Sequence, residues 1–274
     1  MSTLPSRFIA TLDYRTHYIE SGTGSPLVLV HGGGAGADVR GNWEKLCLPL
    51  LAKRRRVIAY DMVGFGHSDA PSPEGFDYGP ESRVDQLIAF VEALGIVGTD
   101  IVGNSMGGRT SLAAAARRPD LLGKVVLMGS AGLDRSMGGA LAALTEYDFT
   151  YAGMERIVRA LTNEGYDPDP EMVQYRLDLS LRPALAQAFG ATMKKLKERH
   201  GLWIEDSEIA SVKNRVLVVN GKNDKIILLS QAYRYLELLE NSLGVILPHC
   251  GHWAMIEHPE TFATIVETFL DDRI

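Results

Sequence analysis

The sequence is poor in the residues that would tie the protein to a nucleic acid, a membrane surface or an oxidising compartment. It has only two cysteines, Cys47 and Cys250, and their separation matches no metal-binding spacing. We therefore expect free thiols in a reducing compartment. Lys and Arg number 28 against 34 Asp and Glu, a formal net charge of −6. The basic surface that nucleic acids and anionic membranes require is missing.

Long apolar runs are also missing. No stretch approaches the roughly 18 to 20 apolar residues of a membrane-spanning helix, and the start of the chain does not have the pattern of a signal peptide. We therefore expect a cytoplasmic protein with neither a membrane nor a nucleic acid as partner. The 274 residues, 46% of them hydrophobic, are enough to build a proper core.

Short strand-forming runs alternate with helical patterns along most of the chain. This order predicts an α/β fold, in which helices flank a mostly parallel sheet. Between the fourth strand and the fifth, only helical patterns occur, and Pro170 and Pro183 each begin a helix. We interpret this region as an inserted helical lid and divide the chain into core 1–133, lid 134–206 and core 207–274. The expected strands are residues 27–30, 57–60, 99–102, 125–128, 215–219 and 244–247.

The segment Gly-Asn-Ser-Met-Gly, residues 103–107, directly follows an expected strand and precedes an alanine-rich helical pattern. This context is typical of a serine nucleophile on a tight turn, with glycines leaving room for close packing. Ser105 would then be the nucleophile. A serine that only caps the following helix fits the same spacing, so the assignment depends on its partners.

A serine hydroxyl attacks efficiently only when a base takes its proton and a third group orients that base. Asp224 and His252 each follow a late strand, and the carboxyl ends of parallel strands meet at one edge of a sheet. The order Ser105, Asp224, His252 is that of the α/β-hydrolase fold. Asp224 could instead shape its turn. His249 and His258 compete for the role of base, although the first lies close to its strand and the second at a helix start.

The glycine-rich loop of residues 31–36 follows the first buried strand. It matches half of an oxyanion hole, and we expect the backbone N–H groups of Gly33 and Met106 to be its donors. A phosphate-binding loop is the rival interpretation, but the P-loop lysine and the dinucleotide fingerprint are both absent. No metal or organic cofactor is expected.

Five segments, in chain order, resemble one known family. HGGGAGADVRGN, VGNSMGG, LMGSAGL, GKNDK and HCGHWAMIEHPE are similar to segments of the meta-cleavage product hydrolases of bacterial aromatic degradation. Within that family, the carbazole-pathway members, which take a 2-aminophenyl substrate, look nearest. The resemblance implies hydrolysis of the C5–C6 bond of 2-hydroxy-6-oxohexa-2,4-dienoates, and assembly into at least a dimer.

The resemblance also implies a set of substrate contacts. Arg176 would bind the dienoate carboxylate, Asn42 and Asn104 would contact the polar end, and Trp253 would border the dienoate. Gly32, in the glycine-rich loop, is expected to contact the substrate as well.

The residues alone leave other roles open for these side chains. Arg176 interrupts an apolar stripe of its helix, where an arginine that covers the edge of the lid is the simpler interpretation. Arg182 competes with it. Most loop asparagines only tie down a loop, and a tryptophan at position 253 could simply pack in the core.

Two other functions also remain open: a carboxylesterase with the same triad, and a ligand receptor that retains this fold. The substituent on C6 of the substrate is not determined by the sequence. The side chains expected to decide it are Met137, Leu141, Met154, Ile157 and Trp203.

Overall fold

A computed structural model describes residues 3–135 and 142–274. It contains an eight-stranded sheet in the order β1-β2-β4-β3-β5-β6-β7-β8. Neighbours from β4 to β8 pair in parallel, whereas β1 and β2 pair antiparallel at one side. The strands are β1 Arg7–Thr11, β2 Tyr14–Ser21, β3 Pro26–Val30, β4 Arg56–Tyr60, β5 Thr99–Asn104, β6 Leu122–Met128, β7 Val216–Gly221 and β8 Ser242–Leu247.

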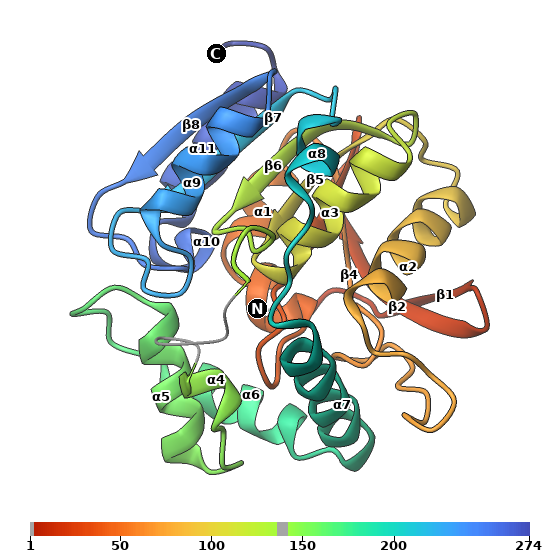
Figure 1. Ribbon diagram of the computed structural model, residues 1–274, viewed down its shortest axis with the longest axis vertical. Coiled ribbons are helices and arrows are strands. Elements are labelled where there is room, and N and C mark those ends of the chain that lie inside the picture. Colours follow the sequence, from red (N-terminus) through yellow and green to blue (C-terminus); the bar gives the residue numbers. More distant parts are fainter. Residues whose placement is uncertain (1–2, 136–141) are drawn as a thin grey trace.

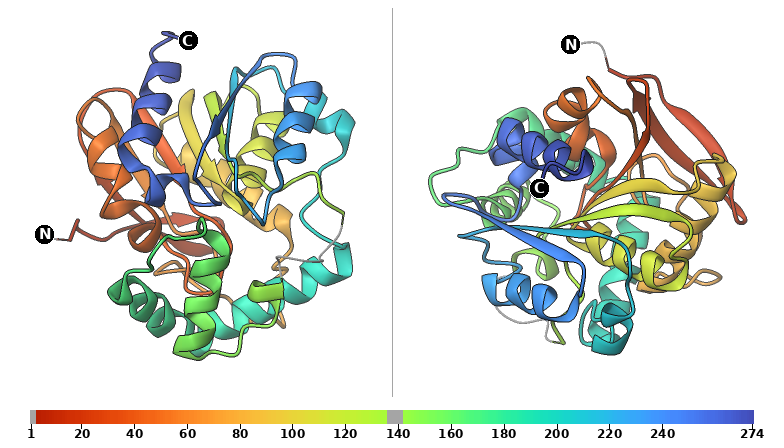
Figure 2. Two further views of the ribbon diagram at one scale, coloured as in Figure 1. Left: turned by 90° about the vertical axis from the view of Figure 1, so that its left-hand side faces the viewer. Right: turned by 90° about the horizontal axis from the view of Figure 1, so that it is seen from above.

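Helices cover both faces of the sheet (Figures 1 and 2). On β3, Leu27 and Leu29 belong to one buried cluster, and Val28 and Val30 belong to the other. A strand buried on both faces has a continuous apolar sequence. Such a run is easily recognised, so the strand could be predicted. One face carries α1 (Cys47–Leu51) and α11 (Pro259–Leu270), and the other carries α2 (Pro80–Ala93), α3 (Met106–Arg117) and α9 (Leu229–Leu238).

The chain between β6 and β7 contains helices joined by loops and no strand among its described residues, as predicted, and is called the helical segment below. Pro170 and Pro183 each occupy the first turn of a helix. Figure 1 shows α4 to α7 grouped at the end of the sheet toward which β6 and β8 point. The helices are α4 Ala142–Thr145, α5 Tyr151–Leu161, α6 Pro170–Ser180, α7 Pro183–Arg199 and α8 Asp206–Ala210.

Two elements near the N-terminus were not predicted. The β1–β2 hairpin precedes the first expected strand, and most residues of β1 are exposed, so the apolar run that marks a central strand is missing. A short π-helix, η1 (Arg40–Glu44), follows the glycine-rich loop. It carries Asn42 into the pocket described below.

Two predictions for the whole chain concern its cysteines and membrane-spanning helices. Cys47 and Cys250 are free and buried, as predicted. Among the described residues, no helix combines the length and apolar character needed to cross a bilayer.

Candidate active site

Ser105 occupies a sharp turn between β5 and α3, with φ of 55° and ψ of −116°. Such a backbone conformation is strained for a residue with a Cβ atom, and this strain is typical of functional sites. The turn fits because a Cβ on Gly103 would lie 2.4 Å from the Gly107 carbonyl oxygen, and one on Gly107 would lie 2.5 Å from the Val30 oxygen. The Ser105 side chain makes no capping hydrogen bond to α3, so the helix-cap role is not observed.

Asp224 and His252 form a buried pair behind the serine turn. His252 Nδ1 lies 2.8 Å from Asp224 Oδ2. The other oxygen, Oδ1, accepts the N–H groups of Ile226 and Ile227 at 2.8 and 2.9 Å. Asp224 therefore shapes its turn and orients the imidazole at the same time. With Nδ1–H directed at the carboxylate, Nε2 is left to act as the base.

The competing histidines lie elsewhere. His258 Nε2 is 3.0 Å from the His249 carbonyl oxygen, in an exposed contact. Neither residue lines the pocket that holds His252.

A pocket joins the candidate residues of the core to the helical segment. Asp224 lies behind His252 and does not line it. The predicted residues that line the pocket are Gly32, Gly33, Asn42, Asn104, Ser105, Met106, Arg176, His252 and Trp253.

The two expected oxyanion donors lie on one wall of this pocket. The backbone of Gly33 runs against Met106, because a Cβ on that glycine would meet Met106 Cε at 2.3 Å. Gly32 has its ideal Cβ position 3.4 Å from Ser105 Cβ. The glycine loop therefore borders the serine directly, which is what an oxyanion hole requires.

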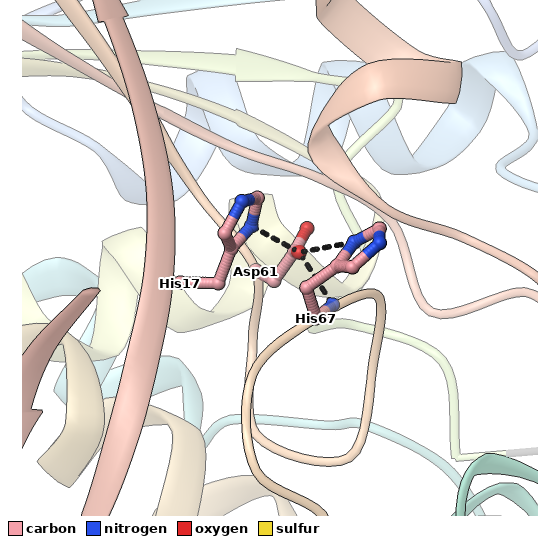
Figure 3. A group of neighbouring side chains, drawn as sticks. All are labelled: His17, Asp61 and His67. Carbon is pink, nitrogen blue, oxygen red and sulfur yellow. Dashed lines mark hydrogen bonds and ion pairs between the residues drawn. The ribbon is translucent and has the colours of Figure 1, made fainter. Parts of the chain in front are cut away.

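The buried His17 and Asp61 and the half-buried His67 form a cluster, the Asp61 cluster, that holds the chain just after the glycine loop (Figure 3). Asp61 Oδ1 accepts the N–H of Val39 at 2.8 Å. Its Oδ2 lies 2.7 Å from His17 Nδ1 and accepts the His67 N–H at 2.8 Å. Asp61 directly follows β4, and no role was predicted for it from the sequence. Its position before Gly-Phe-Gly was the available signal.

The three side chains of the Asp61 cluster also resemble a metal site, since their ligand atoms lie within 4.8 Å of one another. The distance of 2.7 Å between His17 Nδ1 and the carboxylate is that of a hydrogen bond with a shared proton. Burial would raise the pKa of Asp61, but the His17 hydrogen bond and the neighbouring histidines outweigh it and lower the pKa. An ionised Asp61 that accepts protein donors explains the cluster as a support for the loop.

Arg176 is fully buried on α6 and faces the pocket. Its Nη2 donates to the Ala35 carbonyl at 3.1 Å and its Nη1 to Asn42 Oδ1 at 3.4 Å. The guanidinium carbon lies 4.9 Å from the centre of the Trp253 ring. Burial lowers the pKa of Arg176 to about 10, although Asp38 opposes the shift, so the side chain is a cation at neutral pH.

Within the described parts of the chain, no Asp or Glu oxygen forms an ion pair with Arg176 within 4.0 Å, so no carboxylate there neutralises this cation by direct contact. Its Nε is also buried without a hydrogen-bond partner in that part of the chain. Arg182, its competitor, is exposed at the start of α7 and lies outside the pocket. A buried and unpaired cation in a pocket is a site for an anionic group.

The nitrogen and the oxygen of the Asn104 side-chain amide have different surroundings. Its Nδ2 donates to the Met128 carbonyl at 3.1 Å, which ties the serine turn to β6. Its Oδ1 is buried and accepts no hydrogen bond from the described residues. That oxygen lies 2.9 Å from the ideal Cβ position of Gly32, so only a glycine leaves it open to the pocket.

The side chains expected to contact the C6 substituent are mostly elsewhere. Met154 and Ile157 are buried in the core, and Trp203 stacks on Arg135 and Arg199; none of the three lines the pocket. Met154 and Ile157 lie on α5 and Trp203 lies in the loop between α7 and α8; residue spacing alone does not determine which neighbours such side chains contact. Met137 and Leu141 fall outside the described residues. The apolar side chains that do line the pocket include Leu144, Leu161, Met193, Leu196, Leu202, Ile226 and Ile227.

Comparisons with known proteins agree with this geometry. Residues 25–259 match the model of the alpha/beta hydrolase fold, and the chain belongs to that family. A 2-hydroxy-6-oxo-6-(2'-aminophenyl)hexa-2,4-dienoic acid hydrolase of Metapseudomonas resinovorans is 43% identical over 273 residues, 99% of this chain and 93% of that protein. A 2-hydroxymuconate semialdehyde hydrolase of Pseudomonas sp. strain CF600 is 35% identical over 96% of this chain and 93% of that protein.

Solved structures give the same relationship. A serine hydrolase involved in carbazole degradation has a TM-score of 0.90 and 42% identity, covering 98% of this chain and 99% of that one. A meta-cleavage product hydrolase of Pseudomonas fluorescens IP01, solved as a serine-to-alanine mutant with acetates, has a TM-score of 0.91 and 30% identity over 99% of both chains. Within the fold family, the chain is therefore a meta-cleavage product hydrolase, an enzyme that hydrolyses a carbon–carbon bond.

Proposed function

We propose that this enzyme hydrolyses the C5–C6 bond of 2-hydroxy-6-oxohexa-2,4-dienoates that carry an aryl group on C6, with 2-aminophenyl as the preferred substituent. The products are 2-hydroxypenta-2,4-dienoate and an aromatic carboxylic acid. The observation that carries the proposal is the buried Arg176 cation, without an acidic partner, in the same pocket as Ser105 and His252. A neutral ester would leave that cation unpaired, whereas the dienoate carboxylate pairs with it.

In the first stage, the polar end of the substrate is fixed and the dienol becomes a ketone. Arg176 binds the carboxylate, with Asn42 at its side and Trp253 against the dienoate. Asn104 presents its unpartnered Oδ1 to the 2-hydroxyl group, which donates to it. His252 carries the proton from that hydroxyl to C5, which turns C2 into a ketone. This ketone can accept the electron pair of the C5–C6 bond when that bond is broken.

In the second stage, the bond is broken. As the oxygen of Ser105 attacks C6, His252 takes the hydroxyl proton and Asp224 stabilises the imidazolium. The carbonyl oxygen gains charge toward the N–H groups of Gly33 and Met106. Collapse breaks the C5–C6 bond, and its electron pair is delocalised onto the oxygen on C2, which takes the proton from the His252 imidazolium and becomes the hydroxyl of the dienoate product. The acyl group stays on the serine. Water, activated by the same imidazole, then releases the carboxylic acid.

We also propose that residues 134–206 act as a lid over this pocket. The support is that the helical segment supplies Arg176, Leu161 and Leu196, whereas the core segments supply Ser105 and His252. Substrate would therefore be enclosed between the helical segment and the core.

Assembly and location form a further part of the proposal. We propose at least a dimer, supported by the family resemblance and by the open edge of β8, where Leu243 is exposed. We also propose that the enzyme is cytoplasmic, supported by its two free thiols. Sedimentation equilibrium tests the assembly: a mass of one chain, 30.0 kDa, would contradict it. Recovery of the native enzyme outside the soluble cell fraction would contradict the location.

The decisive experiment compares kcat/KM for the 6-methyl, 6-isopropyl, 6-phenyl and 6-(2-aminophenyl) dienoates and for p-nitrophenyl acetate. We expect the aryl dienoates to lead and Ser105→Ala to lower turnover at least about 10³-fold. An ester that outperforms every dienoate would refute the proposed substrate class. Dienoate turnover at the parent rate by Ser105→Ala would refute the nucleophilic mechanism.

A further inference from the structure

Gln231 is a polar side chain on the wall of the main pocket that the mechanism does not use. It lies on α9, one helical turn before Tyr235, so the two residues share a face of the helix. Tyr235 Oη donates to the Ala131 carbonyl at 2.6 Å, and both Ala131 and Gly132 line the pocket. This contact fixes the side of α9 on which Gln231 faces the site.

The amide oxygen of Gln231 has no partner. Its Oε1 is buried and accepts no hydrogen bond from the described residues. Apolar side chains line much of the same pocket; they include Ile226 and Ile227, which directly precede α9, and Leu196 and Leu202. A buried amide oxygen without a donor is destabilising, so it requires an explanation such as a bound ligand.

Gln231 and Arg176 enter the pocket from different parts of the fold. Arg176 comes from α6, which contacts α5, α7 and η1, whereas α9 contacts β7, β8 and α8. Figure 1 shows α9 beside the sheet and α6 among the helices at its end. A substrate with its carboxylate on Arg176 and C6 at Ser105 must extend its C6 substituent away from Arg176. The apolar wall around Gln231 is the surface that remains for it.

We propose that Gln231 determines specificity for an aryl substituent that carries an amino group. An N–H of the substituent donates to Gln231 Oε1, while the aromatic ring packs on Ile226 and Ile227. This proposal rests on the proposed function and adds one recognition contact to it. A site built to accept a hydrogen bond discriminates against a substrate that lacks the donor, because its own polar atom then stays unpaired.

The test compares kcat/KM for the 6-(2-aminophenyl) and 6-phenyl dienoates in the parent, Gln231→Leu and Gln231→Met enzymes. The ratio of the two values should fall about tenfold in both variants, since they keep the size of the side chain and remove the acceptor. Gln174→Leu is the matched control: this glutamine is exposed on α6, donates to Asp178 and lies outside the pocket. Its ratio should equal that of the parent.

The outcomes separate this proposal from the proposed function. If the parent hydrolyses neither dienoate, the proposed function fails. If it hydrolyses both and the ratio stays within twofold of the parent in either folded variant, the role of Gln231 is refuted. Two variants are used so that poor folding of one, checked by thermal unfolding, leaves the other to decide.

Discussion

At the scale of single residues, the site depends on a buried charge that the protein itself does not pair. Among the residues that the structure describes, Arg176 makes hydrogen bonds only to a backbone carbonyl and to Asn42, and it stacks on Trp253. Keeping a cation in this state disfavours the folded protein and favours the binding of an anion. Function and stability therefore make opposite demands at this position.

Replacement of Arg176 by glutamine should raise KM for a dienoate about 10- to 100-fold, because a charge-assisted contact with the carboxylate is lost. Hydrolysis of the neutral p-nitrophenyl acetate should change far less. Arg182→Gln is the control, since Arg182 is exposed and lies outside the pocket. Steady-state kinetics with both substrates would show the difference. Equal losses on the ester and the dienoate would remove the proposed role of Arg176.

Asp38 gives a prediction about pH. It is buried, accepts hydrogen bonds from Tyr175 Oη at 2.5 Å and from the Gly41 N–H at 2.7 Å, and lies near Asp61. Burial, followed by the charge of Asp61, raises the pKa of Asp38 to about 7. In the unfolded chain its pKa would be about 4. The folded state therefore binds the proton more tightly, and the stability from Asp38 is lost as the pH rises from about 4 through 7.

Asp38→Asn should remove this pH dependence. Between pH 5 and pH 7.5, the free energy of unfolding of the parent should fall by about 2 kcal/mol more than that of the variant. Urea unfolding of both proteins at the two pH values measures the difference. Parallel pH profiles would show that Asp38 titrates in the folded state as it does in the unfolded chain.

At the scale of elements, the glycine loop and α6 pack closely against each other beside the site. Gly36 has a φ of +66°, and a Cβ there would lie 2.0 Å from the Arg176 carbonyl oxygen. The loop that borders Ser105 and the helix that carries the cation therefore touch through their backbones. Their relative position is fixed by the absence of a side chain.

Gly36→Ala should destabilise the protein by about 2 to 3 kcal/mol and raise KM for the dienoate, because the new methyl group pushes α6 away. Gly190→Ala makes the same chemical change in α7 with no atom within 4 Å. It should instead stabilise by about 0.5 to 1 kcal/mol through helix propensity. Urea unfolding and kinetics of the two variants test the contrast. An equally stable Gly36→Ala enzyme with normal KM would be inconsistent with this contact.

The central elements could be predicted from the sequence because their signals are local. Strands buried on both faces are short apolar runs, and the prolines at 170 and 183 mark helix starts. The order of Ser105, Asp224 and His252 at strand ends predicts the pair that the structure places together at 2.8 Å. These inferences need only spacing and chain order.

The remainder depends on tertiary packing, which spacing does not specify. Met154 and Ile157 lie on the apolar face of α5 and pack into the core, whereas Leu161, at the end of the same face, lines the pocket. The sequence does not identify Gln231 as a pocket residue, because its role depends on which side of α9 faces the site. The edge hairpin β1–β2 has only a weak apolar pattern in the sequence, because most of β1 is exposed to solvent.

At the scale of the whole molecule, the two thiols report on global unfolding. Cys47 and Cys250 are both fully buried, one in α1 and the other after β8. Burial raises the pKa of both thiols, that of Cys250 to about 12. Reaction with a thiol reagent needs both access and the thiolate form, and the folded protein supplies neither.

The native protein should therefore react with 5,5'-dithiobis(2-nitrobenzoic acid) only as fast as it unfolds, and both thiols should react at once in urea. The rate of release of the yellow thiolate should follow the unfolding rate measured by fluorescence when urea is varied. Rapid release of one equivalent from the native protein would show that one cysteine is accessible in the folded state.

The helical segment leaves the sheet after β6 and returns at β7, and these two strands are direct neighbours in parallel register. The Gly129 N–H donates to the Val219 oxygen and the Val125 N–H to the Arg215 oxygen, so both junctions are held by the core itself. Residues between them can change in number or kind without shifting a single strand. The part of the gene that encodes these residues can thus diverge independently of the rest, so that related enzymes acquire new substrates and keep the same chemistry.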